Sequence, residues 1–298
     1  MIVCIVGPTG VGKTKLSLAL AKAFNTELIS GDSVQVYKDL DIGSAKVTKE
    51  EQAQVTHHMI DILSPEQPFS VALYQTMVRD KIALFEKKGL LPIIVGGTGF
   101  YIKSVLHDFN FENSERDTGF ETLMNDVNDE TLYEQLSALD PQAARKLHPN
   151  NRKRVLHALK RAKDGNKISD NQNQDKPLYD YLMIGLDLDR DTLYDRINKR
   201  VDQMFEEGLV AEVKALYHNS IHTHAVSAIG YKELYEYFDG NQSLEEAKRL
   251  IKRNSRRYAK RQYTYFKNQF NVHWIKTNLD DFDETINQAI KLIKEALS

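Results

Sequence analysis

Short apolar runs alternate with helical patterns along most of the chain. The continuous apolar runs lie at residues 2–6, 27–30, 58–63, 90–95, 181–188 and 272–275. Runs of this kind are typical of strands that are buried on both faces of a sheet. Apolar residues recur at helical spacing over residues 13–24, 70–88, 98–107, 191–206, 209–218 and 244–269. This alternation predicts an α/β fold with a parallel sheet flanked by helices.

The strand pattern stops between about residues 110 and 175. Helical patterns replace it over residues 129–140, 141–149 and 151–165. The polar run 166–176, rich in Asn and Gln, is typical of a flexible connection. We therefore predict an all-helical subdomain, residues 111–176, inserted into an α/β core that consists of residues 1–110 and 177–298.

The stretch "GPTGVGKT" links the first apolar run to the first helical pattern and has the spacing of a phosphate loop. Glycines let backbone N–H groups turn toward an anion, and the following helix directs its positive end at the phosphates. Lys13 adds a cation and the Thr14 hydroxyl can ligate Mg²⁺. The core is thus expected to be P-loop NTPase-like. The expected anion contacts are Gly7, Pro8, Thr9, Gly10, Val11, Gly12, Lys13 and Thr14.

Composition adds mainly exclusions: 41% of the 298 residues are hydrophobic and 28% are charged, as in ordinary folded proteins. The single cysteine, Cys4, excludes a disulfide within the chain and a zinc finger, and its apolar run predicts burial. No apolar run is long enough to cross a membrane. We expect a cytoplasmic monomer with no membrane partner.

A net charge of −2 conceals two strongly basic stretches. Residues 248–267 hold nine Lys or Arg and no Asp or Glu, and residues 145–167 hold nine with only Asp164 opposed. In the first stretch the cations come in pairs every four residues, which predicts a row along one side of a helix. Such a row favours a nucleic acid backbone, although a solvated basic face is the alternative.

Two further positions suggest chemistry. Asp32 follows the second strand, where it could act as a general base, a helix cap or a Mg²⁺ ligand. Thr98 lies in the turn "GGTGFY", as a hydroxyl donor and helix N-cap; the glycines could admit a bulky ligand or simply form a tight turn. Arg196 and Arg200 are one helical turn apart, although such pairs are usually solvated.

The chain resembles the bacterial tRNA dimethylallyltransferases, also called tRNA isopentenyltransferases. The resemblance runs from residue 2 to about 275 and rests on "GPTGVGKT", "ELISGDSVQVYKDLDIGSAK", "HHMIDIL", "PIIVGGTGFYIKSV", "AIGYKEL" and "RRYAKRQYTYFK", in this order. It implies transfer of a dimethylallyl group from dimethylallyl diphosphate to N6 of the adenosine 3′ of the anticodon, position 37, in tRNAs reading codons that begin with U. Diphosphate is released and Mg²⁺ is required.

The resemblance also assigns roles. Asp32 is the general base, Thr98 lies near the diphosphate and target base, Arg200 contacts the diphosphate and Arg196 is a further candidate. Contacts to the tRNA anticodon stem-loop are implied for Asp32, Ser33, Val34, Gln35, Thr98, Gly99, Arg152, Lys153, Arg154, Ser227, Ala228, Ile229, Gly230, Tyr231, Lys232, Arg257, Lys260, Arg261, Gln262 and Tyr265. Two positions depart from the family pattern: Gly10 stands for a usual alanine and Tyr265 for a frequent tryptophan.

Other functions stay open at this point. A phosphate-loop small-molecule kinase would consume ATP and need an Arg-rich lid. An adenylate isopentenyltransferase would act on free AMP, ADP or ATP and would not need two basic stretches. A non-catalytic, nucleotide-dependent RNA-binding protein would have no use for a base at Asp32.

Overall fold

The computed structural model describes residues 1–109, 111, 118–170 and 176–298. The chain forms two compact units, one from Met1–Leu106 with Leu178–Ser298 and one from His107–Pro177. Part of the polar run 166–176 lies outside the described residues. None of the described helices is both long and apolar enough to cross a membrane.

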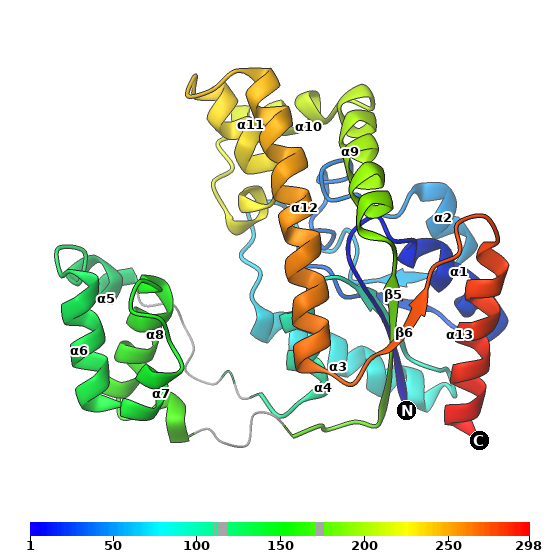
Figure 1. Cartoon of the computed structure of the whole chain (residues 1–298), viewed down its shortest axis with the longest axis horizontal. Helices are drawn as coiled ribbons and strands as arrows, with labels where there is room; N and C mark the ends of the chain where they lie inside the picture. The colour runs from blue at the N-terminus through cyan, green and yellow to red at the C-terminus, as the bar shows by residue number, and fades with distance from the viewer. Residues whose placement is uncertain (110, 112–117, 171–175) are drawn as a thin grey trace. The chain divides into compact units, whose positions relative to one another are not determined.

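The first unit is built on a six-stranded parallel sheet with the order β3-β2-β4-β1-β5-β6 (Figure 1). Its strands are β1 (Ile2–Val6), β2 (Leu28–Ser30), β3 (His57–His58), β4 (Ile93–Gly96), β5 (Tyr181–Asp187) and β6 (His273–Lys276). Strand β1 lies at the centre, between β4 and β5, so the phosphate loop that follows it begins in the middle of the sheet.

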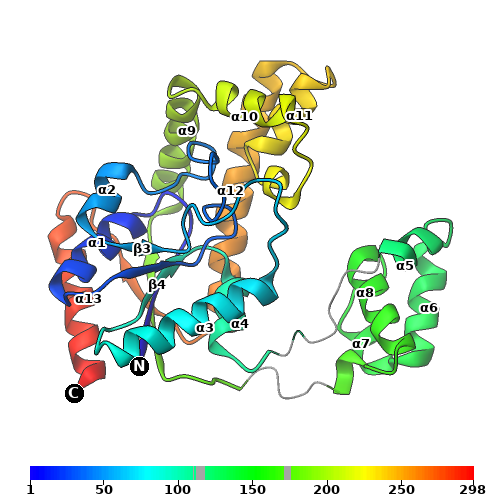
Figure 2. The ribbon, with the colours of Figure 1, turned by 180° about the vertical axis from the view of Figure 1, so that it is seen from behind.

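Nine described α-helices belong to this unit: α1 (Lys13–Ala23), α2 (Lys49–Gln54), α3 (Val71–Lys87), α4 (Gly99–Leu106), α9 (Arg190–Glu206), α10 (Leu209–His218), α11 (Tyr231–Phe238), α12 (Leu244–Gln269) and α13 (Phe282–Leu297). All six helices predicted in this part of the chain are confirmed to within a few residues, whereas α2, α11 and α13 were not predicted. Figures 1 and 2 show α1 beside α13, and α9 beside α12.

The sheet is buried on both faces, as its continuous apolar strands predict. In β1, Ile2, Cys4 and Val6 belong to the cluster formed with α3, α4 and α12. Val3 and Ile5 point to the other face, where α1 and α13 pack. Cys4 is buried, as expected.

The strand predicted at residues 58–63 is wrong beyond His58. Met59 and Asp61 have φ angles of 65° and 54°, in the left-handed region, so the chain turns there and leaves the sheet. An apolar run therefore marks burial at Met59 and Ile60 rather than an extended strand.

The second unit is helical and has its own apolar core. It contains α5 (Thr118–Leu123), α6 (Asp129–Leu139), α7 (Pro141–Arg145), α8 (Arg152–Lys163) and a short 3₁₀ turn (Ile168–Asp170). Leu132 and Leu136 of α6 pack against Val155 and Leu159 of α8, all fully buried. The helical patterns predicted at 129–140, 141–149 and 151–165 correspond to α6, α7 and α8.

Candidate active site

A cavity of about 700 Å³ opens in the first unit beside the phosphate loop. Its wall comes from the phosphate loop, the residues after β2, the loop at residues 43–48, helix α9, the turn at 227–232 and one side of α12. The predicted residues that it brings together are Thr9, Gly10, Gly12, Lys13, Thr14, Asp32, Ser33, Val34, Gln35, Arg196, Arg200, Ser227, Ala228, Ile229, Gly230, Lys232, Arg261 and Gln262.

The phosphate loop requires glycine at its two ends. Gly7 and Gly12 have φ angles of 142° and 111°, and a Cβ on Gly7 would lie 2.8 Å from the Leu186 carbonyl oxygen. Lys13 folds back along the loop, where its Nζ donates to the carbonyls of Gly7 (3.0 Å) and Pro8 (2.8 Å). The loop is thus shaped for an anion with its cation already in place.

Burial lowers the pKa of Lys13 to about 8. The nearby Arg200 charge contributes to this lowering, while the Asp32 carboxylate acts in the opposite direction. A bound anion would therefore stabilise the charged form of Lys13.

One carboxylate oxygen of Asp32 is held by the turn that follows β2. Oδ1 accepts the N–H groups of Val34 (2.8 Å) and Gln35 (3.3 Å). Among the described residues no hydrogen bond reaches Oδ2. Burial raises the pKa of Asp32, and the two N–H groups and Lys13 lower it. The side chain caps its turn and still has one oxygen available as a base.

Thr98 stands at the predicted N-cap position of α4, where its carbonyl accepts the Ile102 N–H at 3.2 Å, but its hydroxyl does not cap the helix. Its Oγ1 is buried and has no hydrogen-bond partner among the described residues. Neither Thr98 nor Gly99 is part of the cavity wall. Tyr258 is part of it, and the pKa of Tyr258 is raised by burial and by the Asp32 charge and lowered by contact with the Thr98 side chain. A buried polar atom without a partner is costly in a folded protein, which keeps Thr98 a candidate for a ligand contact.

The glycines of this turn make room for neighbouring protein atoms, and Gly96 and Gly97 also line the cavity. A Cβ on Gly96 would lie 2.3 Å from the Gly31 carbonyl oxygen, and one on Gly99 would lie 2.2 Å from the Tyr265 ring. The tight-turn interpretation accounts for these contacts, and a ligand close to Gly96 and Gly97 stays a prediction. Tyr265 itself packs on this turn and on Phe266.

Both arginines of α9 reach the cavity. Arg196 Nε donates to the Gly10 carbonyl at 2.8 Å, and Arg200 Nη2 lies 3.4 Å from the Ala45 carbonyl oxygen. Burial lowers the pKa of Arg200, which still carries its charge at neutral pH. Arg196 stays exposed to solvent, whereas Arg200 is partly buried, because the fold turns this side of α9 toward the phosphate loop.

Two predicted tRNA contacts are structural instead. Gln262 is buried, accepts the Thr9 N–H at 3.0 Å and donates to the Gly97 carbonyl at 3.1 Å. It therefore links the phosphate loop to the turn that follows β4. Tyr231 is fully buried and donates its hydroxyl to Glu212. Burial and intramolecular hydrogen bonds occupy both side chains, and of the two only Gln262 also lines the cavity.

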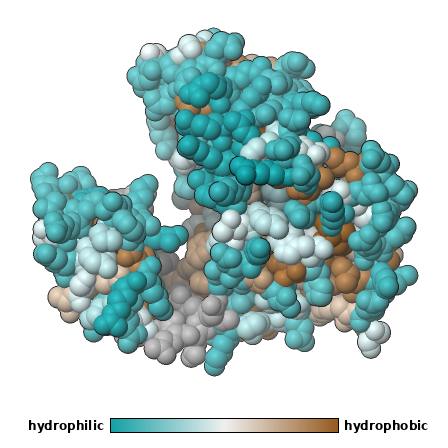
Figure 3. Space-filling view, in the orientation of Figure 1, coloured by the Kyte–Doolittle hydropathy of each residue, from teal (hydrophilic) through white to brown (hydrophobic). Residues whose placement is uncertain are grey.

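The cations of α12 divide between two sides of the helix. Lys248 and Lys252 both pair with Asp202 of α9, at 2.8 and 2.7 Å, and Arg256 Nη1 donates to Asn198 of the same helix. The prediction of one open row is therefore wrong for these three, because α9 covers that side. The exposed cations of α12 are Arg249, Arg257, Lys260, Arg261 and Lys267. Figure 3 shows hydrophilic residues gathered over the upper, N-terminal part of this helix.

A similar division applies to α8 in the second unit. The Arg152 guanidinium donates to the carbonyls of Met124, Asn125 and Val127 and pairs with Asp129 at 2.7 Å. This corrects the prediction that Arg152 binds tRNA, because its donors already hold α8 to the turn after α5. Lys153 and Arg154 are exposed.

Sequence reasoning missed much of the cavity wall. Lys46, Tyr258 and the rest of the loop at 43–48 line it, and Glu212 supports that loop from behind. In the sequence, the stretch "DIGSAK" appeared only as part of a family motif. Its place in the cavity wall could not be read from it, because its contacts are with distant residues.

Comparisons with known proteins identify the family of this chain. A family model described as IPP transferase matches residues 35–269. Proteins named tRNA dimethylallyltransferase from Bacillus pumilus and Bacillus subtilis are each 50% identical over 281 residues, covering 92% of this chain and 88% and 90% of theirs.

Solved structures are similar over nearly the whole chain. The crystal structure of a tRNA isopentenylpyrophosphate transferase from Bacillus halodurans is 48% identical, covers 99% of this chain and 95% of its own, and has a TM-score of 0.77. A eukaryotic dimethylallyltransferase, described as acting on tRNA, is 28% identical, with 99% and 79% covered and a TM-score of 0.84. By sequence and by fold, this chain belongs to the IPP transferase family.

Proposed function

We propose that this chain transfers a dimethylallyl group from dimethylallyl diphosphate to N6 of adenosine 37, 3′ of the anticodon, in tRNAs that read codons beginning with U. The observation that carries the proposal is one cavity that is lined by both the phosphate loop and Asp32. A phosphate loop can hold a diphosphate, and a carboxylate beside it can take a proton from the attacking nitrogen. The names of the curated relatives support this choice of substrates.

In the proposed reaction, N6 forms a bond to the prenyl carbon as the bond from that carbon to the diphosphate oxygen breaks. The electron pair of the broken bond leaves with the diphosphate, and the N6 proton passes to Asp32. Oδ2 is the suitable oxygen, because the N–H groups of Val34 and Gln35 occupy Oδ1. The raised pKa of Asp32 makes it a better proton acceptor than an exposed carboxylate.

Negative charge grows on the diphosphate as it leaves, and the cations beside the loop would stabilise it. Lys13 would exchange its bonds to the Gly7 and Pro8 carbonyls for bonds to the diphosphate. Arg200 would contribute its guanidinium from the opposite wall, and Arg196 would be a further contact at the Gly10 side of the loop.

Thr14 is the proposed protein ligand of Mg²⁺. Thr14 lines the cavity. The described part of the chain contains no group of three His, Cys, Asp or Glu side chains that could hold a metal. One hydroxyl together with diphosphate oxygens and water is a donor set that suits Mg²⁺. When bound, Mg²⁺ would neutralise part of the leaving group's charge.

The tRNA would be held by exposed cations and read by the cavity wall. Arg257, Lys260 and Arg261 of α12, and Lys153 and Arg154 of α8, would contact backbone phosphates. The target adenosine would leave its stack to reach Asp32. The residues proposed to contact it are Ser33, Val34, Gln35, Ser227, Ala228, Ile229, Gly230 and Lys232.

The test supplies labelled dimethylallyl diphosphate with an unmodified tRNA of this codon class, with free AMP, ADP or ATP, or with neither. We expect product only on the tRNA, at the adenosine 3′ of the anticodon. Product on free nucleotide would replace this proposal with an adenylate isopentenyltransferase. A tRNA whose position 37 is guanosine is the matched control and should stay unlabelled.

A further inference from the structure

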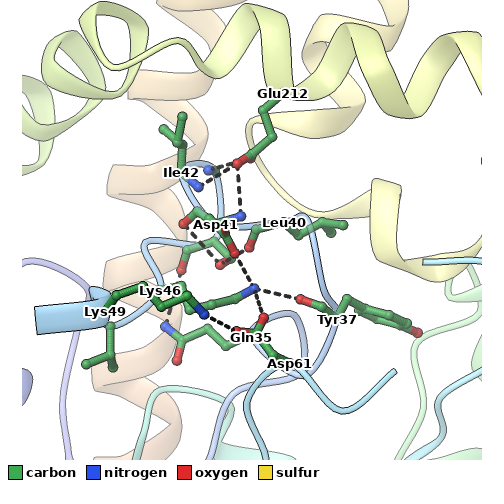
Figure 4. A network of polar contacts seen from close by, with 12 residues as sticks. Gln35, Tyr37, Leu40, Asp41, Ile42, Lys46, Lys49, Asp61 and Glu212 are labelled. Atoms are coloured by element: carbon green, nitrogen blue, oxygen red, sulfur yellow. Dashed lines mark hydrogen bonds and ion pairs between the residues drawn. The ribbon is translucent and has the colours of Figure 1, made fainter. Parts of the chain in front are cut away.

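The Glu212 carboxylate of α10 is saturated by the loop at residues 41–46. Oε2 accepts the N–H groups of Asp41 (2.9 Å) and Ile42 (2.7 Å), and Oε1 accepts the N–H of Gly43 (3.0 Å). The Tyr231 hydroxyl, 2.8 Å away, donates a fourth hydrogen bond to Oε1. Figure 4 shows the carboxylate directed at the loop backbone. A carboxylate has about four acceptor positions, so all of them are used.

A second charged group fixes the other end of the same loop. The Lys46 side chain is only 3% exposed, and its Nζ donates to the Tyr37 carbonyl at 2.7 Å. It also pairs with Asp41 at 2.5 Å and with Asp61 at 2.6 Å (Figure 4). The loop is thus held at both ends by ionised side chains, which gives it little freedom to shift.

The opposite side of this loop is part of the cavity wall. The Ala45 carbonyl oxygen lies 3.4 Å from Arg200 Nη2 and accepts from Gln35 Nε2 at 3.2 Å. The Ser44 carbonyl lies 3.3 Å from the same Gln35 nitrogen. The Gln35 backbone N–H in turn contacts Asp32. One loop therefore contacts the proposed diphosphate ligand on one side and the neighbour of the proposed base on the other.

We propose that Glu212 is a positioning residue for this reaction. Glu212 is not part of the cavity wall. It holds the 41–46 loop so that the Ala45 carbonyl directs the Arg200 guanidinium and the Gln35 amide. The proposal rests on the proposed function for the identity of the substrate, but the contacts that carry it are separate from those of the phosphate loop.

Close packing makes the loop position depend on Glu212. A Cβ on Gly43 would lie 2.6 Å from the Tyr231 ring, so the loop already sits at its closest approach to α11. Replacing Glu212 with Gln would turn an NH₂ group toward N–H donors and leave some of them without an acceptor. The loop would then move away from α10, and its carbonyls would move with it.

The experiment compares Glu212→Gln and Tyr231→Phe with Lys214→Gln, an exposed control on the same helix. Calorimetry measures the Kd of inorganic diphosphate with Mg²⁺, and steady-state assays measure kcat and KM for the prenyl donor. We expect Glu212→Gln to weaken diphosphate binding about tenfold, since several hydrogen bonds to a charged group are lost, and Tyr231→Phe to weaken it about threefold, since one is lost. The control should behave as the wild type.

Repeating the measurement in an Arg200→Gln background separates positioning from simple stabilisation. If Glu212 acts through Arg200, its replacement should cost less than about twofold there, because the two changes are coupled. A full tenfold loss in both backgrounds would overturn the proposal, as would a Glu212→Gln variant that binds diphosphate like the wild type.

The two proposals fail in different ways. A wild-type protein that binds no diphosphate would overturn the proposed function together with this inference. A wild type that binds diphosphate and modifies tRNA, with Glu212→Gln unchanged in both, would overturn this inference alone. If Glu212→Gln does not fold, Tyr231→Phe decides by the same comparison: a loss confined to the wild-type Arg200 background supports the proposal, and an equal loss in both backgrounds overturns it.

Discussion

The charged groups of the cavity and the exposed cations of α12 both suit phosphate, but the fold holds them in different ways. Lys13, Asp32 and Arg200 are desolvated and fixed by backbone hydrogen bonds. Arg257 and Lys260 extend into water. Fixed, desolvated charges act strongly at one point on a small anion, whereas exposed charges interact with a long polyanion and are screened by salt.

The same contrast separates neighbours in the sequence. Arg256 donates to Asn198 of α9, while Arg257, the next residue, is exposed. Identical chemistry therefore serves helix packing at one position and can serve nucleic acid binding at the next. The variants below test this division between fixed and exposed charges.

The largest effect is expected for Asp32→Asn. The amide oxygen can still accept the N–H groups of Val34 and Gln35, so the turn should stay folded. Loss of a positioned base should lower the single-turnover rate at least about a hundredfold. Affinity for tRNA should stay close to that of the wild type. An unchanged rate would remove Asp32 from the role of base.

Lys13→Ala should weaken binding of the prenyl donor by roughly tenfold to a hundredfold, because a desolvated, charge-assisted contact is lost. Equilibrium binding of dimethylallyl diphosphate with Mg²⁺ measures this, and tRNA affinity should hardly change. Lys22→Ala, an exposed lysine at the far end of α1, is the control. A variant that loses tRNA binding instead would contradict the assignment of the loop.

Donor binding should also depend on pH through Lys13, whose pKa lies at about 8 in the free protein. The protonated ammonium attracts diphosphate, so affinity should be full below pH 8 and fall by up to about tenfold per pH unit above it. Lys13→Arg should lose this fall, since arginine stays charged. An identical alkaline fall in both proteins would assign it to another group.

The exposed cations should control salt dependence. Replacing Arg257, Lys260 and Arg261 with Gln should reduce the log–log slope of tRNA affinity against salt by about 2, because each phosphate contact contributes about 0.7 to 0.9. Affinity should fall about tenfold near physiological salt. Lys248→Gln with Lys252→Gln, on the side covered by α9, should leave the slope unchanged, and an equal change in both would break the division.

The smallest effect is expected within α8. Lys153→Gln with Arg154→Gln should weaken tRNA by a few-fold and leave the melting temperature unchanged, because both side chains are exposed. Arg152→Gln should lower the stability of the helical unit, since four protein oxygens lose their donor. The slope of tRNA affinity against salt should match that of the wild type. A flatter slope would show that Arg152 does contact tRNA.

The sequence predicted the parts of this protein whose causes are local. The parallel strands, the helices around the phosphate loop and the helical patterns of the second unit follow from apolar spacing. The positions of Lys13 and Asp32 follow from the rule that ligands bind beyond the carboxyl ends of parallel strands. The error at residues 58–63 arose because burial and extended structure give the same apolar run, and positive φ angles at Met59 and Asp61 separate them.

Tertiary structure decided which polar side chains are available. Arg152, Tyr231 and Gln262 looked like tRNA contacts until distant atoms were found to occupy them. Glu212 attracted no attention in the sequence, because its partners in the 41–46 loop lie about 170 residues away. A spacing rule describes neighbours along a helix or strand, whereas hydrogen-bond partners and burial depend on which elements pack together. The sequence by itself therefore determined most of the elements and the phosphate loop, and packing alone decided which charges stay free to act.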